Sequence, residues 1–411
     1  MDGKSQVTAE PQTTLPLDDD QHLVTAHRKR GLFFIGLTVG GATFALTLQM
    51  ATNANFVADV IGISGYQQGL LEALRETCGI TALVILAMLA GLAEPLVGAI
   101  VLAVFGVGLA SYFVVPDFFW LVVASMVWSQ GVHVWFPLPN SMTLALAEPG
   151  RAGHRLGQIQ AAGAVGSAVG LGAALLLHTV FGVQIRMIYI MAGGAAVLAA
   201  AACLGVPRKI KTTRPRFIFR RKYWLYYLLS FLEGWRKQIF VAFAGYLLVK
   251  QYGTPLWAML TMWMAIQAAG YVTSPLVGRI IDRVGERRVL TFYFACLTVF
   301  FVGYAYIQNR YALYAIYVLD SAFFVMAMAL TTYVNRIAPK SEHTATLSMG
   351  VAMNHVAAVI MPLAGGLIWR YYGHQWAFLM GAAAAAGSII AVMALPKHEA
   401  VPHVHPWPPC G

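Results

Sequence analysis

Charged residues are scarce in this sequence, and long hydrophobic runs take their place. Asp, Glu, Lys and Arg together form 11% of the 411 residues, whereas soluble domains carry about 25%. Hydrophobic residues form 59% of the chain. This balance excludes an ordinary soluble globular domain and predicts a polytopic membrane protein.

Cysteines are few as well. Cys78, Cys203 and Cys296 fall inside apolar runs and Cys410 stands near the C-terminus, so a disulfide framework is not expected. Residues 1–30 are polar and offer no small-residue cleavage site before the first apolar run, so we expect no cleavable signal peptide.

Enzyme motifs are missing too. The sequence holds no GxxxxGK[ST] loop, which leaves ATP drive unsupported, and no HExxH or GxSxG motif. No segment has the spacing of metal ligands or of a nucleophile beside its base. We therefore expect no enzyme activity, no cofactor and no metal site. His398, His403, His405 and Cys410 in the tail could bind a metal, but we interpret the tail as a proline-rich end.

Apolar runs of roughly 20 residues, the length that crosses a bilayer, recur along the chain. We place twelve spans, at about 31–54, 66–90, 96–115, 118–142, 156–180, 184–205, 223–249, 254–277, 289–307, 312–335, 346–369 and 375–395. The longest internal loop holds eight Lys and Arg residues between Arg208 and Lys222. Because basic loops favour the cytoplasmic side, we expect both termini to be cytoplasmic in an inner cell membrane. The net charge of +11 then reflects loops at the membrane surface and not a nucleic-acid partner.

The basic loop divides the chain into two sets of six spans, which suggests a duplicated unit. We expect five parts: a cytoplasmic tail (1–30), an N-terminal six-helix bundle (31–205), a basic cytoplasmic linker (206–222), a C-terminal six-helix bundle (223–396) and a second cytoplasmic tail (397–411). The second span of each half is followed by glycines at matching spacing, Gly91 and Gly98 against Gly278 and Gly285. Parallel repeats of this kind are typical of transporters that bind substrate near the midplane.

The loop after the eighth span reads "GRIIDRVGERR" and resembles the signature loop of the major facilitator superfamily. The resemblance implies an all-α membrane protein with twelve transmembrane helices in two pseudo-symmetric six-helix bundles. It also implies that this loop holds the halves together on the cytoplasmic side in the outward-facing state, through Gly278, Asp282, Arg283, Gly285, Arg287 and Arg288. The alternative is an ordinary basic loop at the membrane surface. The first half departs from the pattern, with Pro95 at the aspartate position and Glu94 one residue earlier.

A second resemblance lies in the fifth span. Gly157, Gly166 and Gly170 have the glycine spacing of the superfamily's antiporter signature, which favours export. Leu171 stands where the signature has proline. Close packing between helices explains the same small residues equally well.

Charged residues inside the spans are the main candidates for function. A charge at the bilayer centre costs at least about 2.5–3.5 kcal/mol, so such residues face a cavity or find a partner. Two readings stay open: local structural pairs on one helix, or a gate in which Glu72 or Glu76 pairs with Arg236 or Lys237 across the halves. The candidates for proton coupling or for the gate are Glu72, Arg75, Glu76 and Glu233, and Asp320 is a further proton carrier.

The superfamily resemblance implies that spans 1, 4, 7 and 10 line a central cavity. We expect substrate or cavity residues there and in the eleventh span, namely Gln49, Asn53, His133, Asn140, Arg236, Lys237, Asp320 and His355. The cationic members could bind an anionic group. For His355, a satisfied interior histidine is the alternative.

Together these features predict a secondary transporter of a small organic or amphiphilic solute, working by alternating access. We expect proton coupling and favour export; the alternative is proton-coupled uptake of an organic anion. A polytopic membrane enzyme and a non-transporting sensor are more distant alternatives. The expected partners are the solute, a proton or other coupling ion and the lipid bilayer, and we expect a monomer.

Overall fold

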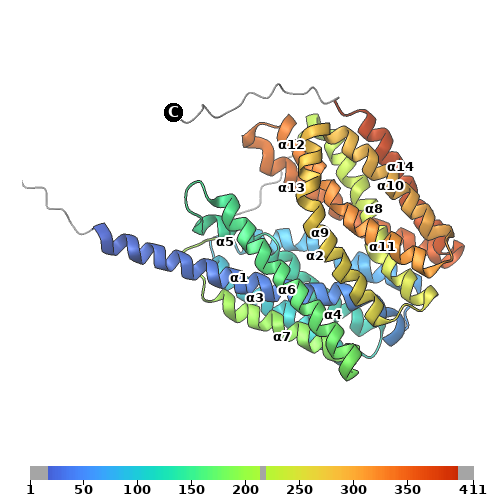
Figure 1. Ribbon diagram of the computed structural model, residues 1–411, viewed down its shortest axis with the longest axis horizontal. Coiled ribbons are helices and arrows are strands. Elements are labelled where there is room, and N and C mark those ends of the chain that lie inside the picture. The colour runs from blue at the N-terminus through green and yellow to red at the C-terminus, as the bar shows by residue number, and fades with distance from the viewer. Residues whose placement is uncertain (1–16, 213–218, 397–411) are drawn as a thin grey trace, which may run out of the picture.

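The computed structural model describes residues 17–212 and 219–396, and these form helices joined by short connections (Figure 1). The long helices are α1 (Leu17–Asn55), α2 (Gly65–Met88), α3 (Glu94–Ala110), α4 (Phe118–Trp135), α5 (Leu138–Leu146), α6 (Ala152–Phe181), α7 (Ile185–Cys203), α8 (Trp224–Tyr252), α9 (Leu256–Val284), α10 (Glu286–Tyr306), α11 (Arg310–Phe323), α12 (Met328–Ile337), α13 (Lys340–Tyr372) and α14 (His374–Met393). Four short turns adjoin them: η1 (Phe56–Val60), η2 (Ser111–Phe113), η3 (Arg221–Tyr223) and η4 (Phe324–Ala327).

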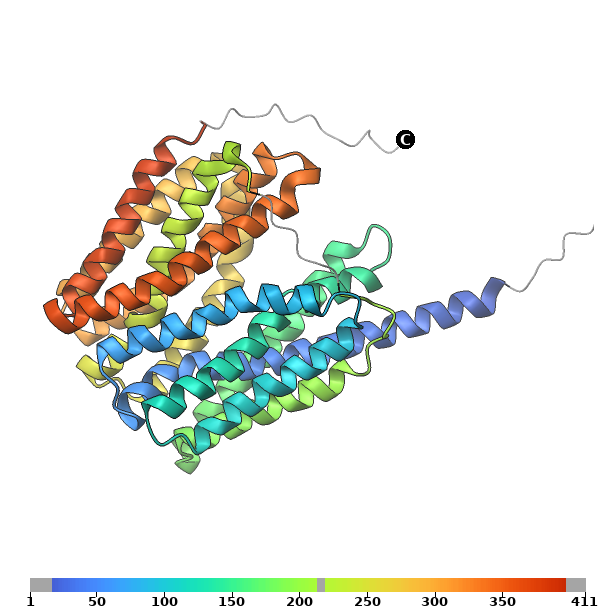
Figure 2. The same cartoon turned by 180° about the vertical axis from the view of Figure 1, so that it is seen from behind.

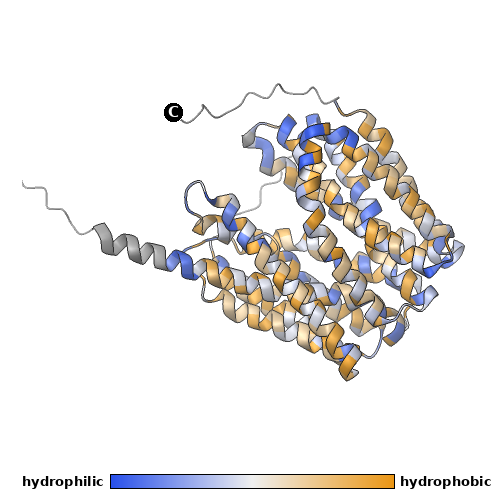
Figure 3. Ribbon diagram, in the orientation of Figure 1, coloured by the Kyte–Doolittle hydropathy of each residue, from blue (hydrophilic) through white to orange (hydrophobic). Residues whose placement is uncertain are grey.

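The expected all-α membrane fold is confirmed, and every expected span is helical. Within the described ranges, nine helices are long and apolar enough to cross a membrane. Helices α2 and α8 fall outside this group because each carries a cluster of three charged residues, and α9 because polar side chains such as Gln267 lower its hydropathy. Figure 3 shows hydrophobic residues along the helices and hydrophilic residues gathered near α12 and near the start of α6.

Two spans are interrupted, and one helix starts earlier than expected. The fourth span turns at Phe136–Pro137, between α4 and α5, because Pro137 and Pro139 cannot continue the helical hydrogen bonds. The tenth span is interrupted by η4 between α11 and α12. Helix α1 begins at Leu17, so part of the stretch expected to be a polar tail is helical.

The helices form two groups with the same pattern of neighbours (Figures 1 and 2). In the first group α1 packs on α6 and α7, and α3 on α4 and α7. In the second group α8 packs on α13 and α14, and α10 on α11 and α14. The groups meet where α2 contacts α13 and α6 contacts α9, which are equivalent seams in a duplicated fold.

The glycine register expected for this duplication is wrong. Gly91 and Gly285 occupy equivalent turns, between the second and third helices of each half, and both have positive φ (89° and 82°). Gly98 lies inside α3 and Gly278 inside α9. The matching spacing therefore joined a turn glycine of one half to a helical glycine of the other.

The two halves are sealed together at one end, which we call the sealed end, where α1 stops and α2 starts. Asn55 donates a 2.9 Å hydrogen bond to the Thr254 carbonyl, and Tyr246 donates one of 2.7 Å to the Ile63 carbonyl. Glycines let α2 and α13 touch, because a Cβ on Gly69 would overlap the Pro362 carbonyl oxygen and lie 2.9 Å from the Gly366 Cα.

Hydrophobic packing between the halves differs between the two ends of the molecule. One core cluster runs continuously from the first half into α8, α9, α10, α11 and α14 around the sealed end. The opposite end, which carries the linker and which we call the linker end, has a separate cluster built only from the second half, including Tyr223, Leu290 and Val334. The halves therefore share a core at the sealed end and keep separate packing at the linker end.

The contact at Gly69 predicts a mutational opening of the sealed end. Gly69→Ala forces α2 away from the α13 backbone, at a cost of order 1–3 kcal/mol to the closed arrangement. Ala54→Cys, placed on α1 where it is buried beside Gly245, reports the opening in a protein without native cysteines. We expect thiol labelling to accelerate about tenfold or more. Gly172→Ala, which points into open space on α6, is the matched control. Equal labelling in the two variants would show that this glycine contact does not seal the end.

Candidate transport site

Charged side chains inside the helices pair first with neighbours on the same helix. On α2, Arg75 forms an ion pair with Glu72, one turn before it. On α8, Arg236 pairs with Glu233 at the same spacing. Of the two readings that the sequence left open, local pairing is the one observed.

The expected gate between α2 and α8 is wrong for this closed arrangement. Among the described residues, no ion pair joins a carboxylate of α2 to a cation of α8. The reason is that each cation has a nearer partner: Arg236 turns into its own half, and Lys237 Nζ donates a 2.7 Å hydrogen bond to Asn354 Oδ1.

Arg236 joins three helices in the interior of the second half. Its guanidinium contacts Glu233, the Asp320 carboxylate of α11 at 3.2 Å and the Tyr293 hydroxyl of α10 at 2.7 Å. Tyr293 in turn donates a 2.9 Å hydrogen bond to Glu233. The Phe324 ring covers the guanidinium at 4.4 Å from its centroid. We call Glu233, Arg236, Tyr293 and Asp320 the Arg236 cluster.

Burial of the Arg236 cluster is almost complete. Arg236 and Asp320 are 0% exposed and Glu233 is 5% exposed. One oxygen of each carboxylate, Glu233 Oε2 and Asp320 Oδ2, is buried without a hydrogen-bond partner in the part of the chain that the structure describes. One cation is therefore shared by two carboxylates and leaves both of them half-satisfied.

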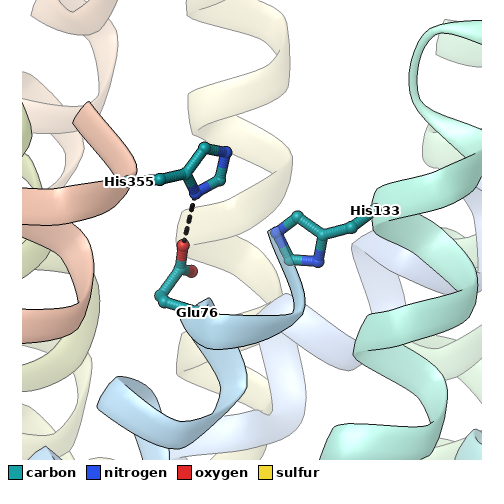
Figure 4. A group of neighbouring side chains, drawn as sticks. All are labelled: Glu76, His133 and His355. Carbon is teal, nitrogen blue, oxygen red and sulfur yellow. Dashed lines mark ion pairs between the residues drawn. The ribbon is translucent and has the colours of Figure 1, made fainter. Parts of the chain in front are cut away.

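A second cluster lies where the halves meet, and we call it the interface cluster (Figure 4). Glu76 comes from α2, His133 from α4 and His355 from α13. Glu76 Oε2 lies 3.4 Å from His355 Nδ1, and the two imidazole centroids are 5.6 Å apart. The His355 ring rests against Gly79, where a Cβ would displace it.

Both clusters connect through neighbouring residues. Lys237 follows Arg236 on α8 and bonds to Asn354, and Asn354 precedes His355 on α13. Gly234 also packs directly against Asn354. Two adjacent positions on each of two packed helices thus link the buried carboxylates to the interface between the halves.

The remaining expected cavity residues are not part of either cluster. Gln49 is buried on α1 and donates a 3.2 Å hydrogen bond to Asn53. Asn140 is exposed on α5. Arg75, beyond its pair with Glu72, stacks over the Trp128 ring at 5.2 Å. The tail histidines and Cys410 lie outside the described residues.

Comparison with known proteins identifies the family. The family model of the Major Facilitator Superfamily matches residues 31–330 and, in a second alignment, residues 226–407. The chain belongs to the major facilitator superfamily. As a member of this transporter superfamily it is a multi-pass membrane protein that moves small molecules by secondary transport.

Solved structures of superfamily type share the fold. A mutant of the nucleoside transporter NupG superposes with a TM-score of 0.74 at 14% identity, covering 88% of this chain and 99% of that one. An inward-facing, unoccupied bacterial homologue of the human lysosomal transporter Spinster gives 0.63 at 14% identity, covering 89% and 95%. A POT family transporter in complex with 5-aminolevulinic acid gives 0.67 at 12% identity, covering 89% and 95%. No curated protein matches the chain by sequence.

The superfamily loop lies at the linker end. Asp282 and Arg283 are exposed on the last turn of α9, and Arg288 is exposed on the first turn of α10. Arg287 donates a 3.3 Å hydrogen bond to the Leu395 carbonyl at the end of α14. Gly285, with its positive φ, makes the turn between the two helices.

The fifth-span glycines pack inside the first half. A Cβ on Gly166 would overlap the Gly40 backbone of α1, and one on Gly170 would press on Phe44. Gly157 meets nothing within 4 Å. Two of the three glycines of the resemblance thus serve the close approach of α6 and α1.

Most of these side chains could be predicted from the sequence, whereas the way in which they converge could not. Tyr293 carried no signal, because a tyrosine in an apolar run looks like packing. Gly65 and Gly69 on α2 have the four-residue spacing of small residues that is typical of a helix interface, and a Cβ on either would overlap α13, so the sequence did carry a signal for this contact. Glu76, His133 and His355 lie far apart in the chain, so no local spacing could join them.

Because two carboxylates share Arg236, substitutions in this cluster should destabilise the protein by unequal amounts. Arg236→Gln leaves two buried carboxylates without a cation and should lower the free energy of unfolding by about 3–5 kcal/mol. Asp320→Asn leaves a balanced Glu233–Arg236 pair and should lower the free energy of unfolding clearly less. Chemical unfolding of the purified protein in detergent measures both, with exposed Arg283→Gln as the control. If Asp320→Asn proves as damaging as Arg236→Gln, the two carboxylates do not share one cation.

Proposed function

We propose that this protein is a proton-coupled transporter of a small organic solute and that the Arg236 cluster carries the coupling proton. The observation that supports this most is the sharing of one buried cation by Glu233 and Asp320. With both carboxylates ionised, the cluster has a net charge of −1 in the buried interior of the second half. It becomes neutral when one carboxyl group takes up a proton.

The wider set of intramembrane charges supports the same assignment. Four carboxylates (Glu72, Glu76, Glu233 and Asp320) face three cations (Arg75, Arg236 and Lys237), so three positive charges against four negative charges leave −1. Arg75 pairs with Glu72, and Lys237 hydrogen-bonds to the neutral Asn354 side chain. Within the Arg236 cluster two carboxylates share one cation, so this cluster holds one carboxylate in excess.

Protonation of the Arg236 cluster can affect the contact between the two halves. When one carboxylate is neutralised, Arg236 keeps a single anionic partner and the packing of α8 on α11 changes. Lys237 and Asn354 carry that change to α13, which forms the seam with α2. A transporter needs such a two-state element whose equilibrium the coupling ion biases.

Orientation follows from the basic residues. We place the linker end and both termini in the cytoplasm, because the linker holds eight Lys and Arg residues. The sealed end then faces outward, and the conformation described is inward-facing. In the outward-facing state the α2–α13 contact parts and the loop around Asp282 comes together with the first half. We infer a monomer in an inner cell membrane.

Export in exchange for protons is the favoured direction, supported by the resemblance of Gly157, Gly166 and Gly170 to the antiporter signature. Proton-coupled uptake of an organic anion is the second candidate. It is supported by Lys237 and Arg75, two cations beside the partly exposed interface cluster, which could receive an anionic group.

Transport by the purified protein in liposomes tests the coupling. A panel of solutes is screened under an imposed pH gradient of either polarity, which also gives the direction. Asp320→Asn or Glu233→Gln should abolish gradient-driven accumulation by removing the excess carboxylate, while solute exchange without a gradient persists. Glu148→Gln is the matched control, since that carboxylate lies in a loop, where hydrogen bonds from Arg155 lower its pKa to about 2. Wild-type accumulation in both variants would refute this proton site.

The exposed Asp282 gives an independent prediction about the linker end. Asp282→Asn should reduce turnover while solute affinity stays unchanged, because the residue touches no ligand and acts only on the outward-facing state. Initial rates and equilibrium binding are compared in the same preparation. Lys250→Gln, exposed at the opposite end of the second half, serves as the control. A parallel loss of binding would assign Asp282 another role, such as folding.

A further inference from the structure

The interface cluster has the composition of a metal site, and nothing in the proton-coupled mechanism uses it. Two imidazoles and one carboxylate converge from three helices (Figure 4). One ligand atom from each of Glu76, His133 and His355 lies within 4.8 Å of the other two. Two histidines with a glutamate are a recurrent ligand set for Zn²⁺ in sites that keep a fourth position open.

Distances within the cluster suit a tetrahedral ion. Zn–N and Zn–O bonds of about 2.0–2.1 Å place neighbouring ligand atoms about 3.4 Å apart. Glu76 Oε2 and His355 Nδ1 are separated by 3.4 Å. A ring nitrogen of His133 lies within 4.8 Å of a ligand atom of each of the other two residues.

Hydrogen bonds around the cluster leave the ligand lone pairs available. His133 Nδ1 lies 2.8 Å from the Ser129 carbonyl oxygen, which can only accept, so this nitrogen carries the proton and Nε2 keeps a free lone pair. A backbone carbonyl that orients a histidine in this way is the usual support of a metal ligand. His355 Nδ1 is buried without a hydrogen-bond partner among the described residues and points to Glu76.

The exposure of the interface cluster and the charges around it are compatible with a bound metal ion. The side chains of Glu76 and His355 are 14% and 21% exposed, so the cluster is reachable from outside the protein core. The neighbouring cations are already engaged, Arg75 by Glu72 and Lys237 by Asn354. Their charge weakens the site but does not occupy the ligand positions.

We propose that Glu76, His133 and His355 bind a divalent transition-metal ion such as Zn²⁺. Glu76 and His133 belong to the first half and His355 to the second, so one ion bridges the halves. Bound metal therefore stabilises the conformation in which the sealed end is closed. The proposal does not rest on the coupling proton, which we assign to a separate cluster.

Binding is tested with Co²⁺, whose visible absorption is intense when its coordination is tetrahedral. The full-length protein in detergent is stripped of metal, and the test background replaces the four cysteines and the tail residues His398, His403 and His405. We expect one equivalent of Co²⁺ to bind with tetrahedral absorption and Zn²⁺ to displace it. Glu76→Gln, His133→Gln and His355→Gln should each weaken binding by at least about 100-fold.

Matched controls keep the result decisive. His178→Gln and His374→Gln change histidines on α6 and α14 outside the cluster and should bind as the parent does. The three ligand variants lie on different helices, and thermal unfolding of each checks its folding. Retained binding in folded ligand variants, or binding that disappears with the tail substitutions, would overturn the proposal.

A second readout tests the bridge between the halves. Zn²⁺ should slow thiol labelling of Ala54→Cys at the sealed end by about tenfold or more when the cluster is intact, because a bridged sealed end opens less often. His355→Gln should abolish that protection. Protection that persists in His355→Gln would show that the ion does not act by joining the halves.

Discussion

Burial of charge in the protein interior is the constraint on which this structure depends. Away from the helix ends, α2, α8 and α11 carry seven ionisable side chains, and each must be neutralised locally or kept near an interface. Arg236 shows the constraint most clearly. Its guanidinium is 0% exposed, yet it fixes the relative positions of α8, α10 and α11 through Glu233, Tyr293 and Asp320. The packing of the second half is thus organised around a charge that could not remain there alone.

That same constraint separates two kinds of polar group. Glu72 and Arg75 form a closed local pair, and its place on one helix makes it insensitive to movement between the halves. Glu76, one turn further along α2, has no such partner on its own helix and meets His355 from the other half. Position along a single helix therefore decides whether a carboxylate supports one half or reports on the contact between both.

Much of the fold could be predicted from sequence, because spans and loops depend on local hydropathy. The limits of the spans, the break at Pro137 and the i,i+3 pairs on α2 and α8 all follow from residues close together in the chain. The direction in which Arg236 turns does not, because it depends on where Asp320 and Tyr293 lie after packing. The glycine register failed for a related reason: spacing alone cannot tell the turn at Gly91 from the helical Gly98.

The two seams between the halves differ in the groups that make the contact. At α2–α13 the contact is backbone against backbone, Gly69 on Gly366, with no side-chain torsion to absorb a displacement. At α6–α9 it is a flexible side chain, Gln267, which donates a 2.6 Å hydrogen bond to the buried Ser167. Under a rocking motion the first seam can only separate as a rigid surface, whereas the second can stretch and follow. A duplicated architecture would then have an unequal hinge, with the axis of rotation nearer to the seam that yields.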